Sequence, residues 1–271
     1  MEKLLLDGKW ELHYAPEHAG KTTAQAVKED PAYTHIEANV PGNAELDLYA
    51  AGKAPEPFWG TNLYAFRPCE FYEWWYTRTF VAPQALADRG AVLCLDGVDT
   101  FSTVYLNGTA VGETDDMMLE YRFDVTEALR EGENEIAVHI RSTVNAARNM
   151  DYPMGVRGPG WEHTDEMICV RKPGHMFGWD IAPRFVSAGL WRSVSICPKR
   201  DTYFKEVYMT TLRADRERAQ VLLKFRFAAE DPMLEGFAVQ VRGTCAESSF
   251  CETVRVKFCS DELSFWVPEP K

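Results

Sequence analysis

The sequence lacks an excess of positive charge. It carries 29 lysine and arginine residues against 41 aspartate and glutamate residues, which gives a formal net charge of −12 at pH 7. Phosphate backbones and anionic lipid surfaces bind proteins through basic patches that displace counterions, so an acidic chain is disfavoured at both. The composition therefore argues against nucleic acid and against a charged membrane surface as partners.

Long apolar runs are missing as well. The chain begins MEKLLLDGKW, where a short leucine run is followed at once by Asp7 and Gly8. This run is too short for the apolar region of a signal peptide, and far shorter than the roughly 20 residues that span a bilayer. We therefore expect no membrane association and a cytoplasmic location.

The cysteines show no spacing typical of a metal or redox site. The chain has seven of them, with no CxxC pair and no cluster with histidine at zinc-binding spacing. An odd number of thiols without an export signal favours reduced cysteines. A Cys245–Cys251 disulfide stays open as an alternative if the protein is exported. We expect no metal and no cofactor, since no phosphate-binding loop and no nucleophile motif occurs either.

The sequence does contain strand-like alternation. Runs of β-branched and aromatic residues alternate with polar ones and are separated by turn residues, which is typical of an all-β sandwich. Within the run over residues 101–113 lie Asn107 and Gly108, which both tolerate the positive φ of a two-residue hairpin turn. The runs span residues 73–81, 91–98, 101–113, 119–125, 134–142 and 190–196.

A domain boundary is expected near residue 200. There Pro198 and a charged cluster interrupt the alternation, which resumes further along the chain. We place one domain over residues 1–200 and a second over residues 201–271. An immunoglobulin-like sandwich takes ~100 residues, so the second domain is expected to be truncated.

Seven blocks of the sequence follow one another in a distinctive order: VPGNAELDLYAAG, PFWGTN, EWWYTRTF, LDGVDTFSTVYLNGTAVGE, GENEIAVHI, VRKPGHMFGWDIAPR and GLWRSVSI. In their order and spacing they resemble the N-terminal part of glycoside hydrolase family 2, closest to its β-mannosidase branch. The resemblance runs almost continuously from about residue 36 to residue 197. It implies a jelly-roll, galactose-binding-like sugar-binding domain, then an incomplete immunoglobulin-like β-sandwich, and a missing (β/α)8 barrel that carries the chemistry.

The missing barrel decides what chemistry to expect of this chain. Retaining glycoside hydrolysis needs two carboxyl groups ~5 to 5.5 Å apart, and the family places both on barrel strands. We therefore expect this chain to contain no catalytic residue and to be inactive alone. The longer protein of which it would be a part is expected to hydrolyse a β-mannoside or related glycoside. The Asn134-Glu135 pair imitates the family's acid/base motif, but it opens a strand of the jelly roll.

The resemblance assigns a role to residues 171–185, with the sequence RKPGHMFGWDIAPRF. In the β-mannosidase branch the equivalent loop reaches into the barrel's active site, which implies that Trp179 and Asp180 contact the sugar. Arg171, Lys172, His175, Gly178 and Arg184 would support the charge of the aspartate or the position of the loop. Ile181 stands where the branch usually has a second tryptophan, so β-galactosidase or β-glucuronidase specificity stays open.

Other interpretations remain at this stage. In one of them, Phe177 and Trp179 only pack the loop against the sandwich, and Asp180 caps backbone amides. In another, the chain is a stand-alone carbohydrate-binding module, and exposed aromatic side chains form its sugar-binding surface. The candidates for this surface are Trp59, Trp161 and Trp179. Family members often associate, but no apolar strip in the sequence specifies a homo-oligomer.

Overall fold

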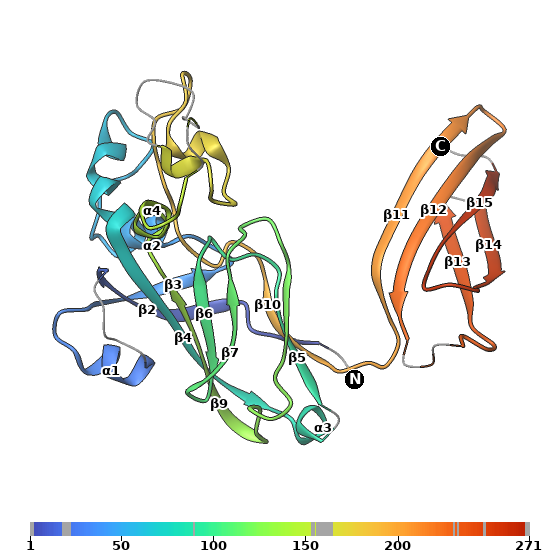
Figure 1. Cartoon of the computed structure of the whole chain (residues 1–271), viewed down its shortest axis with the longest axis horizontal. Coiled ribbons are helices and arrows are strands. Elements are labelled where there is room, and N and C mark those ends of the chain that lie inside the picture. Colours follow the sequence, from blue (N-terminus) through green and yellow to red (C-terminus); the bar gives the residue numbers. More distant parts are fainter. Residues whose placement is uncertain are drawn as a thin grey trace. The chain divides into compact units, whose positions relative to one another are not determined.

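The computed structural model describes residues 3–17, 23–88, 90–152, 155, 165–229, 231, 233–245 and 248–268. The chain forms two compact units that divide between Lys199 and Arg200, here called unit 1 and unit 2. Figure 1 traces both units along the chain. No helix among the described residues has the length and apolar character needed to cross a membrane.

Unit 1 is a sandwich of two antiparallel sheets. The larger has the strand order β3-β2-β4-β9-β6-β7 and the smaller the order β1-β10-β5-β8. The strands of the larger sheet are β2 Gly8–Pro16, β3 Thr34–Val40, β4 Tyr72–Ala82, β6 Ser102–Leu106, β7 Thr109–Thr114 and β9 Gly132–Ile140. Those of the smaller sheet are β1 Leu4–Leu5, β5 Ala91–Leu95, β8 Tyr121–Asp124 and β10 Val194–Pro198.

Alternation along each strand decides which side chains enter the core between the sheets. On β4, Trp74 and Tyr76 point into the main core, whereas Trp75 belongs to a smaller cluster on the other face of the sheet. All three are at most 1% exposed, and burying a side chain of this size stabilises the fold by roughly 1.5–3 kcal/mol. The predicted hairpin turn is confirmed, because Asn107 and Gly108 have φ of 51° and 78°.

Short helices connect the strands, and three of the α-helices in the described part of the chain start at a capping side chain. Asn43 caps one helix by accepting a hydrogen bond from the Leu46 amide at 2.9 Å, and Ser142 caps another by accepting from the Asn145 amide at 3.0 Å. The α-helices are α1 Ala24–Glu29, α2 Ala44–Ala50, α3 Gln84–Ala87 and α4 Thr143–Arg148. The 3-10 helices are η1 Asn62–Phe71, η2 Asp165–Met167 and η3 Gly174–Phe177.

Unit 2 is an incomplete immunoglobulin-like sandwich of two smaller antiparallel sheets. A three-stranded sheet has the order β11-β12-β15, and a hairpin of β13 and β14 lies against it. An immunoglobulin-like sandwich has about seven strands; the described residues of unit 2 form five. Their bounds are β11 Tyr203–Ala214, β12 Arg218–Ala228, β13 Ala238–Cys245, β14 Ser248–Arg255 and β15 Ser260–Pro268.

The thiol of Cys251 is free and exposed, so the Cys245–Cys251 disulfide that the sequence left open does not form in this structure. The strand register separates the two positions, because Cys245 lies opposite Ser248 while Cys251 lies opposite Arg242. Among the described residues, no group of three or more histidine, cysteine, aspartate or glutamate side chains could hold a metal ion.

Candidate functional site

Residues 171–185 form an irregular segment at the same end of unit 1 as η1 and α4 (Figure 1). The segment contains η3 and, directly after it, a tight turn. In this turn the Trp179 amide donates to the Ala182 carbonyl at 2.8 Å, and the Ala182 amide donates back to the Trp179 carbonyl at 3.3 Å. Gly178 precedes the turn with φ of 110°, a conformation that favours glycine. The turn places Asp180 and Ile181 at the tip of the segment.

The tip is open to solvent. Trp179 is 49% exposed and Ile181 is 88% exposed, and Asp180 between them is exposed as well. In the part of the chain that the structure describes, no hydrogen bond or ion pair engages the Asp180 carboxylate, which therefore does not cap backbone amides. A carboxylate in this state accepts hydrogen bonds readily from the hydroxyl groups of a ligand.

Phe177 is the aromatic ring that fixes the segment to the sandwich. It is 0% exposed and packs with Phe101, Val144 and other apolar side chains in a satellite cluster. The Arg184 guanidinium lies 5.4 Å from the centre of the Phe177 ring. Phe177 therefore packs the segment against the sandwich, whereas Trp179 keeps about half of its surface in solvent.

Lys172 anchors the first part of the segment through a buried ion pair. Its ammonium donates to both carboxylate oxygens of Asp99 and, at 2.9 Å, to the Ser187 carbonyl. The hydroxyls of Ser187 and Thr100 also donate to Asp99, at 2.9 and 2.6 Å. The charge of Lys172 is thus neutralised by Asp99. It holds the loop in place and does not pair with Asp180.

Arg184 anchors the other end of the segment between two buried carboxylates. Its guanidinium donates to both oxygens of Glu70 on η1, at distances from 2.7 to 3.1 Å, and to Glu166 on η2 at 3.1 Å. Burial acts to lower the pKa of Arg184, but the hydrogen bonds and charges of Glu70 and Glu166 outweigh it and raise that pKa. Arg184 therefore stays charged, joins three loop elements and does not pair with Asp180.

The two other side chains expected to support the tip, those of Arg171 and His175, lie at the surface. Both residues contribute through their backbones. The Met117 amide donates to the Arg171 carbonyl at 2.9 Å, and the Gly178 amide donates to the His175 carbonyl at 3.1 Å. The carbonyls therefore tie the segment to a neighbouring loop and close η3.

Buried carboxylates beneath the segment were not identified from the sequence. The sequence gives a weak indication that Asp99 is buried, because this residue directly follows the apolar strand β5 and its turn. It gives no such indication for Glu70 and Glu166, since acids in short polar segments are normally solvated. Asp99 lies 73 positions from its partner Lys172, and Glu70 lies 114 positions from its partner Arg184. Only the folded chain brings these charges together.

Glu45 on α2 is a further buried acid next to the Lys172–Asp99 pair. It is 2% exposed, and the Ala188 amide donates to its carboxyl group over a long 3.4 Å. Burial raises the pKa of Glu45 from 4.5 to about 8, with Lys172 acting to lower it and Asp99 to raise it. The carboxyl group is therefore mostly protonated at neutral pH, when the buried cluster keeps one negative and one positive charge.

Replacing Glu45 by glutamine is expected to flatten part of the pH dependence of stability. The native state holds a proton that the unfolded state releases, so this stabilisation is complete below about pH 4.5 and is lost as pH rises through about 8. We expect the melting temperature of the wild type to fall across this range, and that of Glu45→Gln to fall less. Thermal unfolding at a series of pH values measures the difference. Exposed Glu113 on β7 provides the control, Glu113→Gln, and parallel curves for wild type and Glu45→Gln would refute the assignment.

The Asn134-Glu135 pair has a structural role. Asn134 is 2% exposed, accepts a hydrogen bond from the Arg130 amide at 2.9 Å and one from the Asn107 side chain at 2.7 Å. Glu135 forms an ion pair with Lys28 on α1. These contacts close the turn before β9 and fix the neighbouring hairpin.

Of the tryptophans considered for a sugar platform, two are described. Trp59 is 75% exposed, and the turn that carries it is closed by a hydrogen bond from the Asn62 amide to the Trp59 carbonyl at 3.1 Å. Trp179 lies at the tip of the 171–185 segment. Trp161 lies outside the described residues.

Comparison with known proteins places these features in a family. The family model described as "Glycosyl hydrolase 2 galactose-binding domain-like" matches residues 17–192. Beta-mannosidase B of Thermothelomyces thermophilus is 28% identical over 275 residues, which cover 97% of this chain and 30% of that protein. Beta-mannosidase B of Emericella nidulans is 33% identical over 160 residues, or 58% of this chain and 19% of that protein.

Solved structures agree with this similarity. A β-D-mannosidase from Dictyoglomus thermophilum superposes with a TM-score of 0.76 at 27% identity, over 100% of this chain and 32% of that one. A β-glucuronidase from Bifidobacterium dentium shares the fold, with a TM-score of 0.62 at 20% identity over 100% of this chain and 42% of that one. The chain spans less than a third of the length of the Thermothelomyces and Dictyoglomus proteins. Because the family model covers most of unit 1, the chain belongs to glycoside hydrolase family 2 through its galactose-binding-like N-terminal domain.

Proposed function

We propose that this chain is the non-catalytic N-terminal portion of a β-mannosidase-like retaining glycoside hydrolase, and that its 171–185 segment lines the sugar pocket. The observation that carries the proposal is the exposed tip with Trp179 and Asp180, held on a turn between two buried ion pairs. A carboxylate accepts hydrogen bonds from sugar hydroxyls, and an indole packs against the apolar face of a pyranose. The similarity to proteins named β-mannosidase supports this substrate class.

The proposal assigns bond cleavage to polypeptide outside this chain. Retaining hydrolysis needs one carboxyl group as acid and base and a second as nucleophile, ~5 to 5.5 Å apart. In unit 1 the buried carboxylates Glu70 and Glu166 both bind Arg184, so their charges are already committed to holding the loop. The missing (β/α)8 barrel supplies the catalytic glutamates, and this chain supplies part of the pocket wall.

Ile181 bears on specificity within the proposed pocket. It is 88% exposed beside Asp180, and it offers an aliphatic surface without a hydrogen-bond donor. Such a side chain packs against the apolar part of a sugar or of its leaving group and cannot bind an additional hydroxyl. A β-galactoside or β-glucuronide therefore remains an alternative substrate to a β-mannoside.

The test is the activity of the intact polypeptide encoded by the gene. We expect Asp180→Asn to lower kcat/KM for 4-nitrophenyl β-mannoside by about 10- to 150-fold, because hydrogen bonds to a charged group contribute about 1.5–3 kcal/mol. Galactoside and glucuronide substrates assayed in parallel identify the glycone. Asp88→Asn, at an exposed position after α3, is the matched control and should have wild-type activity. Equal activity of both variants would contradict the role of Asp180.

A stand-alone carbohydrate-binding module is the second candidate, favoured by the exposure of Phe58, Trp59 and Tyr64 at 82%, 75% and 65%. Calorimetric titration of the present chain with mannose and manno-oligosaccharides separates the two. One wall of a pocket leaves the sugar largely hydrated, so we expect binding weaker than about millimolar and no glycoside turnover. Tighter binding would support the module, and turnover by this chain alone would overturn the division of labour.

A further inference from the structure

Two cysteines lie next to each other on the outer face of the smaller sheet of unit 1. The register places Cys94 on β5 opposite Ser195 on β10, and Cys197 lies two residues further along β10. The two cysteines are therefore diagonal neighbours on paired strands. The residues beside them in the chain, among them Leu93 and Ile196, enter the main core, so both cysteine side chains point away from that core.

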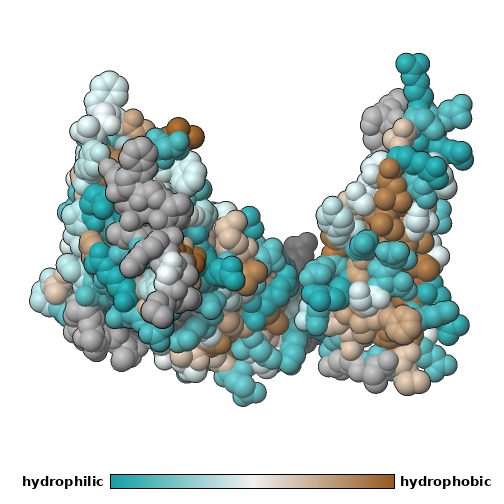
Figure 2. Space-filling model, turned by 45° about the horizontal axis from the view of Figure 1, so that its top comes forward, coloured by the Kyte–Doolittle hydropathy of each residue, from teal (hydrophilic) through white to brown (hydrophobic). Residues whose placement is uncertain are grey.

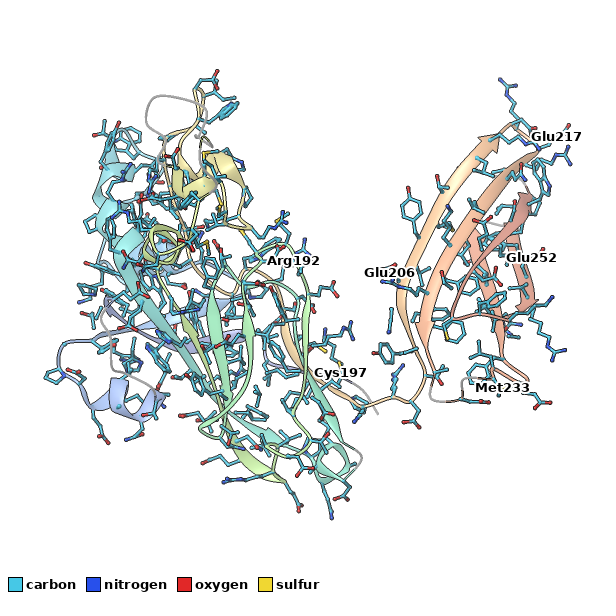
Figure 3. The ribbon with its side chains drawn as sticks, in the orientation of Figure 1. Arg192, Cys197, Glu206, Glu217, Met233 and Glu252 are labelled. Atoms are coloured by element: carbon cyan, nitrogen blue, oxygen red, sulfur yellow. The ribbon has the colours of Figure 1, made fainter. Side chains whose placement is uncertain are left out.

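The two side chains are in contact, and one is more accessible than the other. The Cys94 thiol forms a side-chain hydrogen bond with Cys197, and it also lies 3.8 Å from the carbonyl oxygen of Val92. Both thiols are free in this structure. Cys94 is 3% exposed, whereas Cys197, which Figure 3 labels near the end of β10, is partly exposed. A small molecule in solution therefore reaches Cys197 first.

The environment of Cys94 keeps its thiol protonated. Burial raises the pKa of the Cys94 thiol to about 12, and the charge and hydrogen bond of Cys197 act in the same direction. Arg122, opposite Cys94 on β8, acts to lower this pKa, and Asp96 acts to raise it. Oxidants react with thiolates rather than with thiols, so we expect direct oxidation at Cys197 and not at Cys94.

We propose that Cys94 and Cys197 form a reversible disulfide between β5 and β10 when the protein meets a peroxide. In the first step the Cys197 sulfur attacks one oxygen of hydrogen peroxide, the O–O bond breaks, and the products are a sulfenic acid and one water molecule. In the second step the Cys94 sulfur attacks the Cys197 sulfur, and the sulfenic hydroxyl leaves with the Cys94 proton as a second water molecule. The two thiols lose two electrons, and the peroxide gains them.

The surroundings of Cys197 suit a small polar oxidant. Lys199, two residues after Cys197, forms an ion pair with Asp124 at 2.8 Å. Asp124 in turn lies opposite Val92, the β5 partner of Cys197. Figure 2 shows hydrophilic side chains over much of the visible face of unit 1. Charged surroundings of this kind are open to hydrogen peroxide, which is small and polar.

The position of the bridge favours a disulfide that is easily reduced. Diagonal neighbours in an antiparallel pair have Cβ atoms farther apart than directly opposite residues, whereas a disulfide holds its two Cβ atoms about 3.8 Å apart. Strand β10 must therefore shift slightly towards β5, and the bridge is strained. The shift disturbs few contacts, because among the described residues β1 pairs with β10 at Ser195 and Ile196 alone, and Pro198 has no amide hydrogen to lose. Strained disulfides are the labile ones, so we expect reduced glutathione to reopen this bridge.

Peptide mapping of the present chain tests the proposal. Trypsin separates the two cysteines into the peptides 90–122 and 193–199, neither of which contains another cysteine. The native protein is treated with hydrogen peroxide, its remaining thiols are blocked with N-ethylmaleimide in denaturant, and the digest is analysed by mass spectrometry. We expect the two peptides to appear mainly as one disulfide-linked pair. An excess of reduced glutathione, added to the folded oxidised protein, should convert this pair back to two thiols.

Single substitutions separate the two steps. In Cys197→Ser we expect Cys94 to stay reduced, because its side chain is buried. In Cys94→Ser the sulfenic acid on Cys197 has no resolving thiol, so dimedone should label it several-fold more than in the wild type. Cys69→Ser replaces another buried thiol, at 9% exposure, and is the matched control that should leave the linked pair unchanged.

Several results would overturn the proposal. One is that the two peptides stay unlinked while the exposed thiols of Cys251 and Cys259 are oxidised. Others are a bridge from Cys94 to a different cysteine, or a bridge that glutathione fails to reopen. A linked pair confined to a covalent dimer would overturn it too, because Cys94 and Cys197 would then come from different copies. None of these measurements depends on sugar binding by Asp180.

Discussion

Replacing Arg184 by methionine is expected to lower the free energy of unfolding of unit 1 by about 3–5 kcal/mol. The substitution keeps most of the apolar volume and removes the guanidinium, which leaves Glu70 and Glu166 buried without their shared partner. Their side chains are 3% and 6% exposed, so water cannot replace the lost hydrogen bonds in full. Urea denaturation followed by circular dichroism measures the loss, and hydrogen exchange at the Trp179 and Ala182 amides reports whether the tip loosens with it.

Arg148→Met is the matched control for Arg184→Met. Arg148 binds the same Glu166 at 2.6 Å, but its side chain is 53% exposed, and Glu166 keeps Arg184 as a buried partner when Arg148 is replaced. We therefore expect Arg148→Met to cost at most about 1 kcal/mol. A second variant, Arg184→Met combined with Glu70→Gln, should recover part of the loss because it removes the charge of Glu70, whose remaining partner would be the partly exposed Arg67. Equal losses for Arg184→Met and Arg148→Met would show that the buried pairs do not hold this end of the segment.

Replacing Lys172 by methionine is expected to cost unit 1 a similar amount, about 3–5 kcal/mol. The Lys172 side chain is 0% exposed and its partner Asp99 is 3% exposed, so the substitution leaves a carboxylate in the interior with two hydroxyl donors as its remaining partners. The same denaturation experiment measures the effect. The loss should be smaller when Asp99→Asn is present as well, since the unpaired charge is then removed.

Lys199→Met provides the comparison for Lys172→Met. Lys199 binds Asp124 at 2.8 Å, and both side chains are about half exposed, at 52% and 53%. Solvent screens this pair, so we expect its loss to cost less than about 1 kcal/mol. If Lys172→Met were as mild as Lys199→Met, or if Asp99→Asn gave no relief, the anchoring role of the Lys172–Asp99 pair would be refuted.

The two anchors explain how a segment without regular structure presents a defined tip. Lys172 and Arg184 stand at either end of the segment, and Phe177 buries a ring between them. The residues between these fixed points lose little further entropy when a ligand binds, which favours recognition by Trp179 and Asp180. Under the proposed function, substitutions of Lys172 or Arg184 lower activity although neither side chain contacts the sugar. Asp180→Asn instead changes the side chain that contacts the sugar.

Local patterns in the sequence predicted much of the fold. The alternating run over residues 73–81 corresponds to β4, Tyr72–Ala82, and the hairpin at Asn107 and Gly108 forms as predicted. The order of the motifs predicted the family, which the match over residues 17–192 confirms. These features depend on residues close together in the chain, where the direction of each side chain follows from the strand period.

The sequence also named both anchors, as residues that would support either the charge of Asp180 or the position of the loop. Which of the two they do was not predictable, because a buried cation and an exposed one look alike in a sequence. The partners Asp99 and Glu70 lie far away along the chain, and nothing near them marks them as buried. The pairing depends on which loops the sandwich brings to one end.

The sequence by itself thus determined an all-β chain of glycoside hydrolase family 2, with an aromatic residue and an aspartate in a glycine- and proline-rich segment. The tertiary structure alone decided that Lys172 and Arg184 are buried, that Asp180 and Ile181 stand at an exposed tip, and that the Cys94 and Cys197 side chains meet on paired strands. The physical reason is that strand period and turn geometry are set by neighbouring residues. The desolvation and pairing of a charge are set by packing between elements that the chain joins only through its topology.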